Sequence, residues 1–187
     1  MNILLPSSID VIVELGSGDG KLLKNLLKQN EDNFLIGIEI DPDLYSKEFS
    51  ILPKNVKLIN DSFEDILPRL PDNSISKFIS MLPDPKYIDK THQILWTRLY
   101  QILYDKLIPK GIFLLVTEIT DELLQPVSDN LFNKEVQNIQ QVFQSIGFDV
   151  LNKYEGGPKD LSSSFLKKFQ EDNTQRIRII TFEFIKN

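Results

Sequence analysis

One acidic residue and three glycines, at alternate positions, stand between an apolar strand and a helix near the start of the chain. Glu14 precedes Gly16, Gly18 and Gly20 in the stretch VIVELGSGDGKLLKNLL, residues 11–27. Glycine adopts positive φ without a Cβ penalty and lets the backbone approach a ligand closely. The N-terminus of the following helix offers backbone N–H groups to an anionic group. The pattern predicts a loop that binds a phosphate, a dinucleotide or adenosylmethionine.

The spacing of the glycines distinguishes these ligands. A phosphate-binding loop needs a glycine five residues before Gly20 and a Ser or Thr after Lys21, but the sequence has Leu15 and Leu22 there. The dinucleotide fingerprint needs a glycine three residues after Gly18, and that position is Lys21. The remaining pattern, acidic-x-Gly-x-Gly-x-Gly, resembles motif I of the Rossmann-like adenosylmethionine-dependent methyltransferases. A plain strand-to-helix turn is the alternative.

The composition excludes several kinds of site. The 187 residues include no cysteine and one histidine, His92, so disulfides and thiolate metal sites are excluded, and we expect no metal. No apolar run is long enough to span a membrane and the first residues do not form a signal peptide, so we expect a cytoplasmic protein without a membrane partner. The net charge of −6 argues mildly against a nucleic-acid partner, although lysines gather near the C-terminus.

Apolar strands and helical segments alternate along the whole chain, which predicts one α/β domain over residues 1–187. The expected strands are residues 10–15, 34–39, 56–59, 76–82, 112–118, 148–154 and 176–185. The expected helices are residues 21–29, 43–49, 62–67, 88–107, 121–145 and 161–169. Trp96, Leu99, Tyr100 and Leu103 lie at helical spacing and are expected in the core.

The last strand should pair antiparallel with its neighbours, because little chain precedes it to form a crossover helix. We therefore predict a seven-stranded, mostly parallel sheet with an antiparallel C-terminal strand and helices on both faces. This arrangement resembles the Rossmann-like class I methyltransferase fold.

An acidic residue stands at the end of each of the first five expected strands. These residues are Glu14, Glu39, Asp61, Asp84 and Glu118. Ligands of open α/β sheets bind outside the carboxyl ends of the strands. Any one of these acids could instead cap a helix or begin a turn, Asp61 most clearly. Five at one edge of the sheet favour a binding site.

The chemistry of adenosylmethionine suggests a role for each of the first three acids. Glu39 suits the ribose hydroxyls, and Asp61 suits the adenine amine, with Ser62 and Phe63 beside the ring. Glu14 would act on the ammonium group or fix the glycine loop. The cofactor-binding set is therefore Glu14, Gly16, Gly18, Gly20, Glu39, Asp61, Ser62 and Phe63.

From residue 11 to about residue 118 the chain resembles the tRNA (guanine-N7)-methyltransferases. The shared features are Glu14-Leu-Gly-Ser-Gly, Gly37-Ile-Glu39, Asn60-Asp61, Pro71-Asp-Asn-Ser74, Pro83-Asp84-Pro85 and the strand that ends at Glu118. The resemblance implies that Asp84 is the catalytic-site acid between cofactor and guanine, and that Glu118 replaces a guanine-binding aspartate. It implies transfer of a methyl group from S-adenosyl-L-methionine to N7 of a guanine in tRNA.

The chain departs from this family in its basic residues. The family follows Pro-Asp-Pro with Trp and a dense basic run, whereas this chain has the sparser Lys86, Lys90 and His92. The family's C-terminal Thr-x-Phe-Glu motif is echoed only by Ser163-Ser164-Phe165-Leu166, which makes Ser164 a candidate substrate contact. Further candidate RNA contacts are Lys159, Lys167 and Lys168.

Two alternatives to a tRNA methyltransferase remain open. One is a methyltransferase of the same fold acting on a small molecule or a protein, and the other is a non-catalytic adenosylmethionine-binding module. No residue of the sequence indicates a docking site for a partner subunit.

Overall fold

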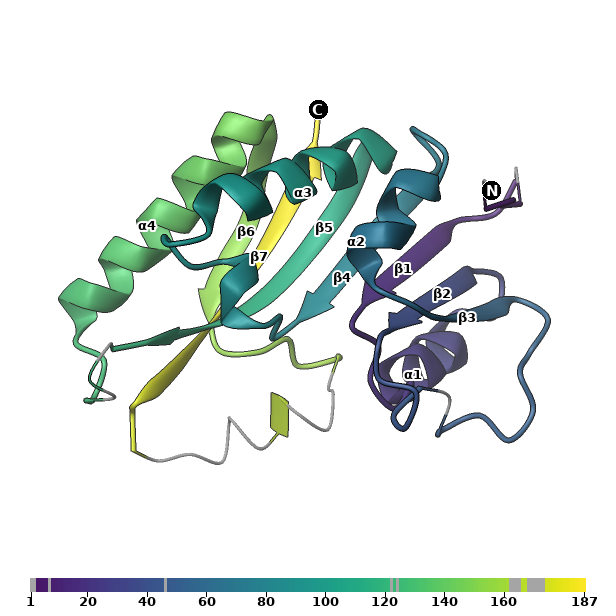
Figure 1. Cartoon of the computed structure of the whole chain (residues 1–187), viewed down its shortest axis with the longest axis horizontal. Coiled ribbons are helices and arrows are strands. Elements are labelled where there is room, and N and C mark those ends of the chain that lie inside the picture. Colours follow the sequence, from purple (N-terminus) through teal and green to yellow (C-terminus); the bar gives the residue numbers. More distant parts are fainter. Residues whose placement is uncertain are drawn as a thin grey trace.

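The computed structural model describes residues 3–6, 8–45, 47–121, 123, 125–161, 166–167 and 174–187. Seven strands form one sheet in the order β3-β2-β1-β4-β5-β7-β6 (Figure 1). The strands are β1 (Val11–Leu15), β2 (Phe34–Glu39), β3 (Val56–Asn60), β4 (Ile75–Met81), β5 (Leu107–Thr120), β6 (Phe148–Glu155) and β7 (Ile177–Lys186). β7 pairs antiparallel with both β5 and β6, and the other pairs are parallel. The predicted antiparallel C-terminal strand is confirmed.

Helices pack on both faces of this sheet. They are α1 (Lys21–Gln29), α2 (Phe63–Ile66), α3 (Gln93–Lys106) and α4 (Asp129–Ile146), with short 3-10 turns η1 (Leu67–Arg69) and η2 (Pro85–Tyr87). The larger core lies between the sheet and α2, α3 and α4, and includes the four predicted residues Trp96, Leu99, Tyr100 and Leu103. A smaller core lies on the opposite face, where α1 packs on β1 and β2. The seven-stranded fold predicted from the sequence is confirmed.

Three expected helices differ from the observed ones. The expected helix at 43–49 is wrong, because residues 43–45 and 47–48 form turns. At the start of these turns the Asp41 carboxylate accepts the backbone N–H of Asp43 at 2.8 Å. The helix expected from residue 88 begins only at Gln93, after η2. The helix expected from residue 121 begins at Asp129, where the Ser128 side chain caps its N-terminus and Pro126 precedes it.

The expected helix at 161–169 lies mostly outside the described residues. Residues 166 and 167 are helical, and Leu161 and Leu166 are buried in the core on the α1 face. The side chain of Gln29, at the end of α1, donates a hydrogen bond to the backbone oxygen of Asp160 at 3.2 Å. The described residues Asp160, Leu161 and Leu166, between β6 and β7, therefore pack on the same face as α1.

β1 and β4 lie side by side at the centre of the sheet, where the strand order reverses. β2 and β3 extend from β1 on one side, and β5, β7 and β6 extend from β4 on the other. In open α/β sheets, ligands bind at the carboxyl ends of the strands beside such a switch point. The topology therefore predicts a ligand-binding site at the loops that follow β1, β2, β3, β4 and β5.

Candidate functional site

The loop between β1 and α1 borders open space at two of its glycines. Gly16, Gly18 and Gly20 all have positive φ, of 72°, 54° and 82°. A Cβ atom built on Gly16 or Gly18 meets no atom within 4 Å, so both positions border open space. The backbone N–H groups of Gly16 and Ser17 both donate to the backbone oxygen of Ile38 at 2.9 Å. The loop is thus held against the end of β2 and leaves space for a ligand.

A further glycine lets α1 lie close to the sheet. A Cβ atom at Gly37, in β2, would lie 2.5 Å from Leu23 Cδ1 and 2.8 Å from Ser17 Oγ. No real Cβ fits at such distances, so a side chain at Gly37 would force the side chains of Leu23 and Ser17 to shift. The close approach of these elements depends on this residue.

Glu39 holds the glycine loop. Its side chain is buried, Oε2 accepts the backbone N–H of Gly18 at 2.7 Å, and Oε1 accepts the backbone N–H of Asp41 at 2.9 Å. A carboxylate has about four acceptor positions, so each oxygen retains capacity for a ligand hydroxyl. Glu39 therefore also holds the glycine loop, a role that was not predicted from the sequence.

Glu14 is a buried carboxyl group with an unused acceptor. The residue is 2% exposed, and its Oε2 atom accepts no hydrogen bond from the part of the chain that the structure describes. Burial and then the charges of Asp19 and Glu39 raise the pKa of Glu14 well above its usual value. An unpaired buried carboxyl is costly, which is the condition expected where a ligand supplies the missing donor.

Glu14, Glu39 and Glu118 point to the same face of the sheet. Side chains alternate along strands, so each acid shares a face with the residue two positions before it. These residues are Ile12, Gly37 and Val116; Ile12 and Val116 belong to the core on the α1 face, and Gly37 contacts α1. Burial raises the pKa of the half-buried Glu118. The structure therefore brings three of the five predicted acids to one edge and one face. Glu39 contacts the glycine loop, whereas β4 separates β1 from β5, the strand that carries Glu118.

Asp61, Ser62 and Phe63 connect β3 to α2. Oδ1 of Asp61 accepts the Ser62 N–H at 2.8 Å, and the backbone N–H of Asp61 donates to the backbone oxygen of Glu39 at 3.1 Å. Ser62, rather than Asp61, caps α2, because its hydroxyl accepts the backbone N–H of Glu64 at 3.2 Å. Asp61 is thus not the helix cap and remains half-exposed, with Arg69 at 3.7 Å.

An exposed apolar side chain lies between Glu39 and Asp41. Ile40 is 70% exposed although it follows a buried strand directly. Ile40 was not among the site residues predicted from the sequence, because a single exposed apolar side chain is common on a protein surface and gives no signal by itself.

Asp84 lies in a constrained turn after β4. Leu82 has a positive φ of 55°, which is costly for a residue with a branched side chain, and its backbone N–H donates to the Val116 oxygen at 2.7 Å. Asp84 is exposed and its Oδ1 atom accepts the Lys86 N–H at 3.0 Å, which caps η2. The structure therefore presents the Asp84 carboxylate at the end of β4, beside the switch point, on a turn held by Pro83 and Pro85.

A cavity of about 500 Å³ lies beside this turn, between the segment after Asp84, the end of β5 and α4. Its charged lining residues are Asp89, Lys90, Asp121 and Glu135, and it also borders Glu118, whose side chain points to the other face of the sheet. Lys90 Nζ donates to Glu135 Oε1 at 2.7 Å, so this lysine forms an ion pair across the cavity wall. The cavity is mainly acidic and suits a ligand that carries hydrogen-bond donors.

The remaining predicted basic residues lie in different places. Lys86 is exposed and its Nζ lies 4.8 Å from the centroid of the Tyr87 ring. His92 pairs with Asp89, with 2.9 Å between Nδ1 and Oδ2. Lys159 and Lys167 are exposed, whereas Ser164 and Lys168 lie outside the described residues.

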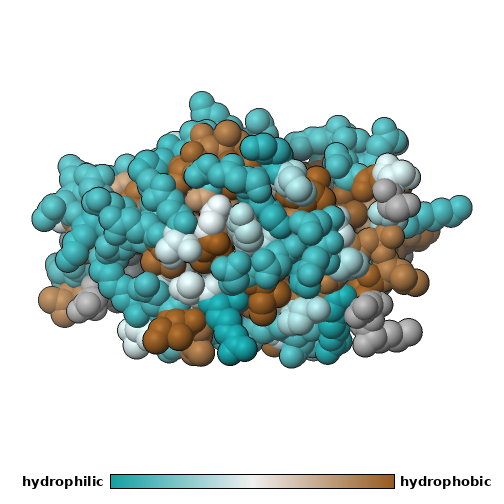
Figure 2. Space-filling model, turned by 90° about the horizontal axis from the view of Figure 1, so that it is seen from above, coloured by the Kyte–Doolittle hydropathy of each residue, from teal (hydrophilic) through white to brown (hydrophobic). Residues whose placement is uncertain are grey.

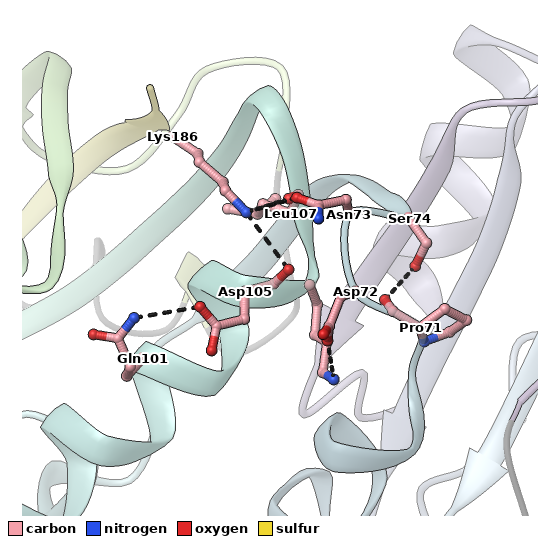
Figure 3. Close-up of polar contacts among 9 residues, drawn as sticks. Pro71, Asp72, Asn73, Ser74, Gln101, Asp105, Leu107 and Lys186 are labelled. Atoms are coloured by element: carbon pink, nitrogen blue, oxygen red, sulfur yellow. Dashed lines mark hydrogen bonds and ion pairs between the residues drawn. The ribbon is translucent and has the colours of Figure 1, made fainter.

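The Pro-Asp-Asn-Ser motif lies at the opposite edge of the sheet (Figure 3). Residues 71–74 join η1 to the start of β4 and dock on the end of α3, where Asp72 Oδ1 accepts from Lys106 Nζ at 2.6 Å. Asn73 Oδ1 accepts from Lys186 Nζ at 2.9 Å, which ties the turn to β7. Seen from above the view of Figure 1, the surface is mainly hydrophilic with several hydrophobic patches (Figure 2). This motif supports the fold and does not line the site.

Neither a metal cluster nor a membrane helix emerges from the described residues. No group of three or more His, Cys, Asp or Glu side chains among them could hold a metal ion. None of their helices is long and apolar enough to cross a membrane.

The strand order, the antiparallel β7 and the glycine loop after β1 define the class I methyltransferase fold. Solved structures with this fold superpose on nearly the whole chain. A 16S rRNA methyltransferase, KamB, aligns with a TM-score of 0.70 at 13% identity, over 95% of this chain and 88% of that chain. An antibiotic-related methyltransferase aligns with a TM-score of 0.67 at 18% identity, over 94% and 87% of the two chains. The predicted fold class is confirmed.

The chain belongs to the family described as "Putative methyltransferase", whose model matches residues 8–155. It is 30% identical over 117 residues to a tRNA (guanine-N(7)-)-methyltransferase of Histophilus somni, covering 58% of this chain and 46% of that protein. It is 28% identical over 145 residues to a protein of the same name from Hydrogenovibrio crunogenus, covering 74% and 60%. A bifunctional methyltransferase of Rickettsia bellii is 28% identical over 141 residues, covering 72% and 24%. The resemblance indicated by the motifs is confirmed, and the chain spans less than two thirds of each relative.

Proposed function

We propose that this protein is an adenosylmethionine-dependent methyltransferase that methylates N7 of a guanine in tRNA. The observation that carries the proposal is the arrangement of Glu14, Glu39 and Glu118 on one face, around a glycine loop that borders open space. Of these, Glu14 has a buried oxygen that accepts no hydrogen bond from the described chain. The names of the relatives support tRNA guanine as the acceptor.

The residues present fit the cofactor. Glu39, already fixed by two backbone N–H groups, would accept the ribose hydroxyls with its remaining lone pairs. Asp61 would accept the adenine amine, while Ile40 and Phe63 supply apolar surface for the ring. Glu14 would pair with the ammonium group, which would supply a donor for its unused oxygen. Gly16 and Gly18 leave the backbone open to the ligand.

Methyl transfer to guanine N7 requires the protein mainly to orient the two reactants. Adenosylmethionine supplies an electrophilic methyl group, and guanine N7 has an in-plane lone pair that needs no general base. Catalysis would therefore consist mainly of alignment for in-line transfer. Asp84 and Glu118 would hold the guanine by accepting hydrogen bonds from N1–H and the 2-amino group. A guanine within folded RNA must first be exposed, at a cost of a few kcal/mol.

A second candidate is a methyltransferase acting on a small molecule or a protein. The acidic lining of the cavity beside Asp84, and the pairing of Lys90 with Glu135, favour an acceptor that carries donors rather than phosphates. The relatives named as tRNA enzymes favour the first candidate over this one. We also propose a cytoplasmic location, where a tRNA substrate would be available.

Methyl transfer to defined RNAs tests the proposal. The purified chain would be incubated with methyl-tritiated adenosylmethionine and unmodified tRNA transcripts, in parallel with transcripts in which guanosine is replaced by 7-deazaguanosine. We expect label in the first set and none in the second, because the second lacks N7. Equal labelling of both sets would exclude N7 as the acceptor. Label only in added protein or small molecules would support the second candidate, and binding without transfer would indicate a non-catalytic module.

A further inference from the structure

An aromatic pair connects the two halves of the candidate site. Phe63, in α2, and Tyr87, in η2, have ring centroids 4.8 Å apart at an interplanar angle of 52°. Phe63 follows Asp61 and Ser62, where adenine is proposed to bind, and the backbone N–H of Tyr87 donates to the backbone oxygen of Asp84 at 2.9 Å. The pair therefore lies between the cofactor side of the site and the turn that carries Asp84.

Tyr87 also lies beside charged side chains. Lys86 Nζ lies 4.8 Å from the ring centroid. Burial and then the charge of Glu64 raise the pKa of Tyr87. The ring contact with Phe63 therefore joins η2 to α2, the helix that also carries Glu64.

No other side chain of η2 is as well placed to hold the turn. Pro85 and Lys86 are exposed, whereas Tyr87 is half-buried and packs against the main core. Among the described residues, the hydrogen bond of the Asp84 side chain is the one it accepts from the Lys86 N–H. The orientation of this exposed carboxylate therefore depends on how firmly η2 is docked.

We infer that Tyr87 is a positioning residue that couples cofactor binding at α2 to the placement of the Asp84 turn. Occupation of the adenine subsite would restrict Phe63, and the ring contact would pass this restriction to η2. The inference rests on the proposed methyltransferase function and goes beyond it by assigning the connection between the cofactor and Asp84.

Tyr104 supplies a matched control. It forms the same two kinds of contact at the other edge of the sheet, with ring centroids 4.9 Å from Phe148 and with Lys186 Nζ 4.9 Å from its own centroid. Replacing either tyrosine by alanine removes one aromatic pair and one cation–π contact. A loss that reflects stability alone should therefore appear in both variants.

The first measurement is the kinetics of methyl transfer to tRNA. We expect Tyr87→Ala to lower kcat about tenfold or more, through loss of alignment, while adenosylmethionine affinity measured by calorimetry changes less than about threefold. Tyr87→Phe keeps the ring and should retain kcat within about threefold of the wild type. Tyr104→Ala should keep the kcat of the wild type. Thermal melting measures any difference in stability separately.

The second measurement does not depend on the acceptor. Trp96 is the single tryptophan of the sequence. Its indole N–H donates to the backbone oxygen of Asp89, a residue of the segment that follows η2, at 2.6 Å. Tyr87 and Trp96 line the same cavity of about 80 Å³. We expect adenosylmethionine to change Trp96 fluorescence in the wild type, Tyr87→Phe and Tyr104→Ala, and to leave it unchanged in Tyr87→Ala.

The outcomes separate this inference from the proposed function. An active wild type with Tyr87→Ala indistinguishable from Tyr104→Ala in kcat and fluorescence overturns the inference alone. So does a wild type that binds adenosylmethionine without any change in Trp96 emission. A wild type that binds adenosylmethionine and shows the expected fluorescence pattern, but transfers no methyl group to tRNA, supports the coupling and contradicts the acceptor. A wild type that does not bind adenosylmethionine overturns both.

Discussion

Glu39 accepts the backbone N–H of Gly18 at 2.7 Å, so the carboxylate that ends β2 holds the loop that follows β1. Its other oxygen accepts the backbone N–H of Asp41 at 2.9 Å. The side chain is therefore fixed before any ligand binds, and a ligand hydroxyl would meet oxygens that need no reorganisation. Preorganisation of this kind favours affinity, because less conformational freedom is lost on binding.

Glu39→Ala should weaken adenosylmethionine binding by more than the removal of its own ligand contacts. Each charge-assisted hydrogen bond contributes roughly 1.5–3 kcal/mol, and the variant also releases the Gly18 N–H. We expect affinity to fall at least about a hundredfold by calorimetry. Glu31→Ala, at an exposed position beyond α1, serves as the control. Unchanged affinity in Glu39→Ala would remove Glu39 from the cofactor site.

The sequence predicted the strands and the acids that follow them because both depend on local patterns. Apolar runs define β1, β2 and β4, and the period of two along a strand then determines which face Glu14 and Glu118 share. The start of α4 was less predictable. The apolar pattern begins earlier in the sequence, whereas Pro126 and the Ser128 cap place the observed start at Asp129.

Contacts between distant residues could not be predicted from local patterns. The Lys90–Glu135 ion pair joins residues 45 positions apart, and the Glu39–Gly18 bond joins residues 21 positions apart. Both depend on how loops fold against the finished sheet. The sequence identified Asp84 as a candidate, but no local pattern indicates that Tyr87 connects the Asp84 turn to α2 through Phe63.

Glu14→Gln should make the free protein more stable at neutral pH. Because burial raises the folded pKa of Glu14 above its usual value of 4.5, the native state holds a proton that the unfolded state releases as pH rises. Stability then falls with rising pH above the unfolded pKa, and the penalty is absent where both states are protonated. Glutamine removes this dependence.

Urea unfolding at several pH values measures this effect. The free energy of unfolding of Glu14→Gln should exceed that of the wild type by an amount that grows as pH rises above about 4.5 and that vanishes below about pH 4. Adenosylmethionine affinity should fall in the same variant, because glutamine carries no charge for the ammonium group. A pH-independent difference in stability would contradict the buried, protonated state of Glu14.

Arg178→Lys should destabilise the edge of the sheet formed by β6 and β7. The guanidinium binds Glu155 through two nitrogens, at 2.8 and 2.9 Å, and Asp129 at 2.8 Å, and it stacks 4.0 Å from the Phe132 centroid. Lysine cannot reproduce this planar geometry, so we expect a decrease of about 1–3 kcal/mol in urea unfolding. Arg176→Lys, at an exposed neighbouring position, should change stability by less than about 0.5 kcal/mol. Equal effects at both positions would show that the contacts of Arg178 add little.

Lys86 and Lys90 should differ in their contribution to tRNA binding. Lys86 is exposed, whereas the Lys90 ammonium is bound to Glu135 at 2.7 Å. Removing a lysine that binds one RNA phosphate should flatten the dependence of log affinity on log salt by about one unit. We expect this change in Lys86→Ala and a smaller one in Lys90→Ala, measured by filter binding between low and moderate salt. The opposite order would mean that Lys90 leaves Glu135 to bind RNA.

Asp84→Asn should abolish most turnover while leaving the turn intact. The Asp84 Oδ1 atom accepts the Lys86 N–H at 3.0 Å, and asparagine offers the same carbonyl acceptor, so η2 should retain its cap. The amide nitrogen of asparagine, however, replaces an acceptor by a donor and would oppose a donor on the guanine edge.

Comparing turnover with cofactor affinity separates the two roles of Asp84. If it orients the guanine, tRNA methylation should fall about a hundredfold or more, while adenosylmethionine affinity changes much less. If Asp84 only shapes the turn, asparagine should substitute almost silently, because it favours turns as strongly as aspartate. Circular dichroism and thermal melting show whether the variant is folded. Near-normal methylation by Asp84→Asn would indicate that Glu118, the other acid proposed to bind guanine, makes the main contact. Its half-buried carboxyl faces the same side as the glycine loop.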